Sequence, residues 1–171
     1  MSTRLLDYVD RGVLARLDQH LAEALARRVP GTSDEVLLGA AFASRAIRRG
    51  HVCADLTSIG DTPLLDETET KLEPVSPPPA AKWLAALRES ELVSPGVDDA
   101  DPRPLVLDEA GRLYLYRYAR YERRLADSIL ARAGHDNDVD AELLRQGLER
   151  LFSEDEVSKD HEEARKQRIA A

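Results

Sequence analysis

Apolar positions recur at helical spacing along much of the chain. An early segment, ended by a Pro-Gly pair, has its apolar residues three or four apart: Leu14, Leu17, Leu21, Ala24 and Leu25. The next segment opens with the spacing of a capping box, Thr32-x-x-Glu35, in which each side chain can bond the other residue's free backbone N–H. Its apolar stripe ends at Gly50, a residue suited to a left-handed helix end. We therefore predict a helix over 33–49.

The period changes to two in the second half of the chain. Residues 104–107 and 112–116 are short apolar runs separated by a turn containing Gly111, which can adopt a positive φ. This pattern predicts an antiparallel hairpin. Residues 51–55 alternate more weakly and are predicted to join the same small sheet.

The alternation assigns the hairpin's aromatic side chains to one face. Leu113 and Leu115 share a face, so Tyr114 and Tyr116 point to the other. We predict that these two tyrosines, with the adjacent Arg117, are exposed anchors for a protein partner, because Tyr and Arg are favoured in such interfaces.

From about Arg117 the period returns to that of a helix. Tyr118, Tyr121 and Leu125 form one stripe, with arginines spread around it. The stripe could be a platform on which nucleic-acid bases stack. Alternatively, its tyrosine rings could be buried in the core with their hydroxyl groups in contact with solvent. A base-stacking platform presents its aromatic residues together on an open sheet. The sequence therefore favours core for Tyr118 and Tyr121.

Further patterns complete the predicted architecture. Helices are expected over 80–93 and 140–152, and a mobile loop rich in Pro and acidic residues over 60–81. We predict an α+β fold, mainly helical, with a short antiparallel sheet. Its domains would be 1–135 and a helical connector over 136–171.

Charge limits the possible functions. The chain has 171 residues, 43% apolar and 33% charged, with a net charge of −8, which argues against a free-standing non-specific DNA-binding protein. The charge is uneven, since residues 112–135 carry six basic and two acidic groups. A small nucleic-acid-binding module built on that basic window stays open as an alternative, as does a structural scaffold.

Sites for catalysis or metal binding are not evident. There is no glycine-rich phosphate loop of either common type, and the pair His51-x-Cys53 lacks the further ligands that a closed zinc site needs. We expect neither a catalytic residue nor a metal site. The N-terminus has no secretory signal pattern, and the single cysteine fits a reducing compartment, so we expect a cytoplasmic protein without a membrane segment.

Several segments in order resemble the N-terminal domain of RecD, the alpha subunit of bacterial exodeoxyribonuclease V. They are RGHVCADL (49–56), KWLAALRESELV (82–93), PLVLDEAGRLYLYRYARYE (104–122), VDAELLRQGLERLF (139–152) and HEEARKQRIAA (161–171). The resemblance implies a non-motor domain of a RecBCD helicase–nuclease, which processes double-strand breaks for recombination. It also implies docking onto a RecC-like subunit, a RecB-like subunit in the same complex, and DNA contact through the assembly.

The sequence departs from the family at its end. Gln167 matches the glutamine that contacts adenine in that family, but the phosphate loop, magnesium site and motor domains that follow there are missing here. The resemblance thus implies ATP and magnesium for the full-length family alone. We expect this chain to be a fragment or a truncated reading frame that does not hydrolyse ATP by itself.

Overall fold

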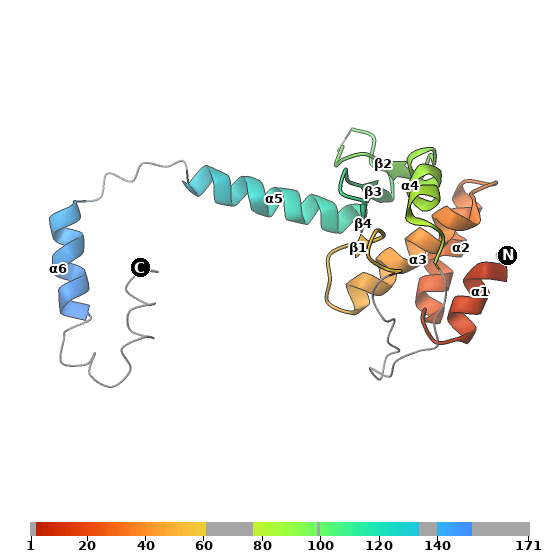
Figure 1. Cartoon of the computed structure of the whole chain (residues 1–171). Helices are drawn as coiled ribbons and strands as arrows, with labels where there is room; N and C mark the ends of the chain where they lie inside the picture. Colours follow the sequence, from red (N-terminus) through yellow and green to blue (C-terminus); the bar gives the residue numbers. More distant parts are fainter. Residues whose placement is uncertain (1–2, 61–76, 99, 134–139, 152–171) are drawn as a thin grey trace. The chain divides into compact units, whose positions relative to one another are not determined.

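The computed structural model describes residues 3–60, 77–98, 100–133 and 140–151 (Figure 1). The chain divides into two compact units, 1–128 and 129–171. In chain order the elements are α1 (Thr3–Asp10), α2 (Arg16–Arg28), α3 (Asp34–Arg48), β1 (Ala54–Asp55), α4 (Ala80–Arg88), β2 (Val93–Ser94), β3 (Leu105–Leu107), β4 (Arg112–Leu115), α5 (Tyr116–Ala133) and α6 (Ala141–Leu151). The predicted class, mainly helical α+β, is confirmed.

Helix α3 is the centre of the core of the first unit. It contacts α1, α2, α4 and the strands β1 and β4. The Phe42 ring of α3 lies between two other aromatic rings in edge-to-face geometry. Its centroid is 5.6 Å from that of the Tyr8 ring and 5.7 Å from that of the Trp83 ring. A Cβ on Gly39 would lie 3.1 Å from the Leu113 side chain, so glycine lets α3 approach the sheet closely.

The limits of α3 match the predicted helix, but its capping differs. The N-cap is Ser33, whose Oγ accepts from the Val36 N–H at 3.4 Å. The Thr32 hydroxyl instead donates to the Val29 carbonyl at 2.6 Å, so the capping box predicted from Thr32 is wrong. At the other end Gly50 has φ 82°, as expected of a left-handed residue.

Helix α2 buries a face that is shifted from the one its leucines suggest, with Leu25 at its edge. Leu17 is 60% exposed, whereas the Asp18 side chain is completely buried. The Asp18 carboxylate accepts from the Arg48 guanidinium at 2.7 and 3.1 Å and from the Ala15 N–H at 2.9 Å. A buried charge is tolerated because it is paired and hydrogen-bonded, and this network joins α2 to the end of α3.

The sheet has four strands in the order β1-β4-β3-β2. The hairpin β3–β4 is antiparallel and turns at Gly111, φ 84°, and β1 pairs antiparallel with β4. Both pairings confirm the predicted sheet, but β1 is shorter than the predicted 51–55, and Tyr116, predicted on the strand, is the first residue of α5. Strand β2 pairs parallel with β3, so the sheet is mixed, and this strand was not predicted. Two residues are too few for a period to be recognised.

Helix α4 begins at Ala80 and ends at Arg88, so the predicted loop over 60–81 and the predicted helix over 80–93 both extend too far. Residues 61–76 of that loop lie outside the described residues. The Trp83 indole N–H donates to the Glu35 carbonyl at 2.8 Å, which joins α4 to the first turn of α3. The predicted domain boundary at 135 stays a prediction.

Candidate partner interface

Tyr114 is not an exposed anchor. Its side chain is 5% exposed and packs with Val106, its partner across the β3–β4 ladder, and with Ala119. The physical reason is that α5 follows β4 directly, so the first turn of that helix covers the sheet face that the alternation left open. Tyr114 is therefore removed from the predicted interface.

The Tyr114 hydroxyl and the half-buried Cys53 thiol form a hydrogen-bonded contact. Burial raises the pKa of Tyr114, and hydrogen bonding to Cys53 raises it further. Burial also raises the pKa of the Cys53 thiol. A raised thiol pKa makes Cys53 a weaker nucleophile and metal ligand.

Tyr116 and Arg117 lie together at the start of α5. Tyr116 is half-buried, and its hydroxyl donates to the Asp98 carbonyl at 3.1 Å, which holds the ring against the loop after β2. Arg117 is exposed beside it. The structure thus brings two of the three predicted anchor residues to one accessible place.

The stripe of Tyr118, Tyr121 and Leu125 is on the surface. Tyr121 is 55% exposed, so the prediction that it is a core residue is wrong, and Leu125 on the same stripe is 62% exposed. The rings of Tyr118, which is half-buried, and Tyr121 lie edge to face with centroids 6.4 Å apart. Helical spacing cannot tell a core stripe from an interface stripe, although the high density of arginine around this one was a signal.

Helix α5 carries a net positive charge. Five arginines occur in its 18 residues, against Glu122 and Asp127. The Arg123 guanidinium donates to the Val97 carbonyl at 3.3 Å, on the side of the helix that faces the domain. The remaining arginines, at 117, 120, 124 and 132, are exposed.

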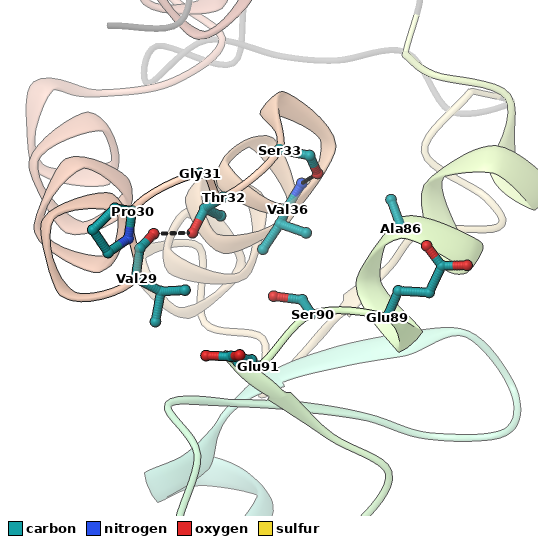
Figure 2. A pocket seen from close by; sticks show the side chains of 10 residues that line it. All are labelled: Val29, Pro30, Gly31, Thr32, Ser33, Val36, Ala86, Glu89, Ser90 and Glu91. Atoms are coloured by element: carbon teal, nitrogen blue, oxygen red, sulfur yellow. Dashed lines mark hydrogen bonds between the residues drawn. The ribbon is translucent and has the colours of Figure 1, made fainter.

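A groove of about 320 Å³ lies between the α2–α3 connection and the end of α4 (Figure 2). Val29, Thr32 and Val36 lie on one side of it, and Glu89 and Glu91 on the other. The Thr32 hydroxyl and the Ser33 Oγ are engaged with backbone groups rather than offered to a ligand. With two carboxylates and no basic residue among its lining residues, the groove does not suit a phosphate or a nucleic acid.

The described part of the chain lacks two kinds of feature, a metal-binding cluster and a membrane-spanning helix. Across those residues, no group of three or more His, Cys, Asp and Glu could hold a metal ion. The predicted adenine contact, Gln167, lies outside the described residues. None of the helices that the structure describes is long and apolar enough to cross a bilayer.

Comparison with known proteins identifies the family. Residues 10–114 match the model described as "RecBCD enzyme subunit RecD, N-terminal domain". The chain belongs to this RecD N-terminal domain family. The RecD match begins at the end of α1 and finishes within β4, so α5 and α6 lie beyond it.

Curated relatives carry the same description. The chain is 38% identical over 120 residues to the RecBCD enzyme subunit RecD of Mycobacterium tuberculosis, which is 70% of this chain and 19% of the relative. It is 33% identical over the same length to RecBCD enzyme subunit RecD of Mycolicibacterium smegmatis, with the same shares covered. The chain thus spans about a fifth of the length of these RecD relatives.

Proposed function

We propose that this chain is the non-motor, subunit-docking part of a RecD-like subunit. It binds a RecC-like subunit within a RecBCD-type helicase–nuclease that repairs double-strand breaks by homologous recombination. The observation that carries the proposal is the match of residues 10–114 to the RecD N-terminal domain. The relatives are described as subunits, which supports a function in assembly.

The start of α5 is the proposed contact. Tyr116 is preorganised by its hydrogen bond to the Asp98 carbonyl, so little side-chain entropy is lost when a partner covers the ring. Arg117 supplies an adjacent exposed cation. A fixed aromatic ring beside an arginine is the composition found in the energetically dominant part of interfaces.

The remaining expectations follow from the assembly. A RecB-like subunit would join the same complex, and DNA would be contacted through the complex in the cytoplasm. ATP and magnesium belong to the motor of the full-length family, and a contact between Gln167 and adenine would operate in that context. We propose no catalytic residue for this chain.

A second candidate is a nucleic-acid-binding module using residues 112–135. The observation in its favour is the exposed Tyr121 among arginines on α5. Against it, the Tyr118 and Tyr121 ring planes are 79° apart, which does not present parallel faces to successive bases. The net charge of −8 opposes a phosphate backbone over the rest of the surface.

A capture experiment tests the proposal. The tagged chain is incubated with the cognate RecC-like subunit, and separately with single-stranded and duplex DNA at about 150 mM salt, where the Debye length is about 8 Å. We expect capture of the subunit and weak, salt-sensitive DNA binding. Replacing both Tyr116 and Arg117 by Ala should weaken capture at least tenfold, about 1.4 kcal/mol. The matched control is Arg28→Ala, an exposed arginine on α2.

Tight DNA binding at that salt concentration, with no subunit captured, would establish the nucleic-acid module instead. Capture that the double variant leaves unchanged would move the contact away from the start of α5.

A further inference from the structure

We infer that the exposed stripe of α5 is the docking face for an acidic, partly apolar helix on the partner subunit. This rests on the proposed function and extends the contact from the start of α5 along the helix. The α5 stripe is defined as Tyr118, Tyr121 and Leu125, and Ile129 continues its spacing on the same helix.

The exposure of the α5 stripe follows from how the helix sits on its own domain. Ala119 is buried against Val106 and Tyr114, and Arg123, four residues on, donates to the Val97 carbonyl. Residues four apart share a helix face, so 119 and 123 mark the side that faces the domain. The α5 stripe lies on another side, and every residue from 120 to 133 is exposed.

The composition of the α5 stripe is that of a protein interface. Tyr121 and Leu125, 55% and 62% exposed, are large apolar side chains on neighbouring turns. The edge-to-face contact between Tyr118 and Tyr121 holds their rings before any partner arrives. Spacings of three and four residues make a narrow seam, which fits the apolar stripe of one partner helix.

Charge determines the kind of partner. Arg117 and Arg124 are seven residues apart, so they lie on the same side of the α5 stripe. Five arginines against two acidic residues on this helix would repel a second copy of α5. A partner helix with carboxylates beside its apolar residues would complement it.

Nucleic acid fits the same face less well. Glu122 is four residues after Tyr118 and borders the α5 stripe away from Arg117 and Arg124. A phosphate backbone laid along the stripe would meet this carboxylate. A protein helix can place a basic residue opposite Glu122 and acidic residues opposite the arginines.

Apolar substitutions provide the first test. Binding of the full chain to the cognate RecC-like subunit is measured by calorimetry for Leu125→Glu and Tyr121→Ala. We expect each to weaken binding at least about tenfold, as removal of a central anchor does. The matched control is Leu144→Glu on α6, which replaces another exposed leucine, 46% exposed, and should stay within about twofold of the wild type. Thermal melts should be unchanged for all three, because the replaced side chains are exposed.

A charge reversal provides the second test. Arg124→Glu should slow association several-fold at low salt, and the difference should shrink as salt is raised. Arg28→Glu makes the same charge change on α2 and should leave the rate unchanged.

The outcomes separate this inference from the proposed function. If the wild-type chain does not capture the subunit, the proposed function fails. If it does, and the α5 variants bind like the wild type or Leu144→Glu binds as weakly as they do, the assignment to the α5 stripe fails. A dimer or a DNA complex that Leu125→Glu abolishes, without any subunit capture, would also overturn it.

Discussion

Helices α3 and α5 have similar patterns and opposite positions in the molecule. Both are long, 15 and 18 residues, and both have apolar residues at helical spacing. In α3 almost every residue from Val36 to Ala46 is buried, whereas α5 is exposed from Arg120 to its end. The middle of α3 consists of small and apolar residues, but α5 has an arginine on every turn of its first half. The spacing of apolar residues predicts a helix. The residue types around its whole circumference indicate how many of its sides can be buried.

The largest expected effect separates the two helices directly. Trp83→Ala should lower the free energy of unfolding by about 4 kcal/mol, because it leaves a cavity beside α3 and removes the hydrogen bond to the Glu35 carbonyl. Leu125→Ala on α5 should cost less than about 0.5 kcal/mol. Urea unfolding of both variants is monitored by circular dichroism. Fluorescence would not serve, because Trp83 is the chain's single tryptophan and the first variant lacks it. Similar losses in the two variants would mean that α5 is packed in solution.

The ion pair between the buried Asp18 and the partly exposed Arg48 comes next. Asp18→Ala should cost about 3 kcal/mol, because the Arg48 guanidinium and the Ala15 N–H lose their acceptor. Arg48→Met should cost less in the Asp18→Ala background than in the wild type, because the pair is already broken there. The measurement is a double-mutant cycle of urea unfolding. Additive costs for the two changes would contradict the pairing.

The same substitution in each helix sharpens the comparison. Ala41→Gly in α3 should cost about 2 kcal/mol, since it loses both helix propensity and a fully buried methyl group. Ala126→Gly in α5 should cost about 1 kcal/mol or less, from propensity alone. Thermal melts compare the two variants, and the larger loss must occur in α3 if α5 is exposed.

The smallest expected effect is a pH dependence at the first turn of α3. The hydrogen bond from the Lys82 ammonium, 2.9 Å from the Glu35 carboxylate, holds the pKa of Glu35 below its ordinary value. A lowered pKa adds stability above the unfolded-state pKa of about 4.3, and this is lost as the pH falls through the folded-state pKa. The contribution should be below about 1 kcal/mol for a surface pair. Glu35→Gln should remove it, seen as a shallower loss of stability between pH 5 and 3, roughly. An unchanged slope would mean that the pair contributes nothing.

The parts of the fold that could be predicted are those set by local interactions. Helix α3, the left-handed Gly50 and the β3–β4 turn at Gly111 follow from period and turn chemistry within a few residues. Strand β2 could not be predicted, because its two residues depend on pairing with β3, where Val93 pairs with Leu105 and Ser94 with Val106.

The candidate interface shows the same division. Tyr116 and Arg117 were predicted as anchors from the strand alternation and from the residue types favoured in interfaces, and they lie together at the start of α5, where their role as anchors stays a prediction. Tyr114 was expected beside them, but the first turn of α5 covers it. Tyr121 was expected in the core, and it is exposed.

The sequence by itself determined α3, the hairpin and the resemblance to RecD, because repeated spacing and ordered motifs are properties of the chain, but it did not predict α1 or the end of α4. The tertiary structure alone decided which side of each element is covered. A pattern of apolar residues states that a face can be buried, but burial needs a second surface. That second surface exists around α3 and is supplied by the first turn of α5 for Tyr114, whereas at the α5 stripe we propose that a partner supplies it.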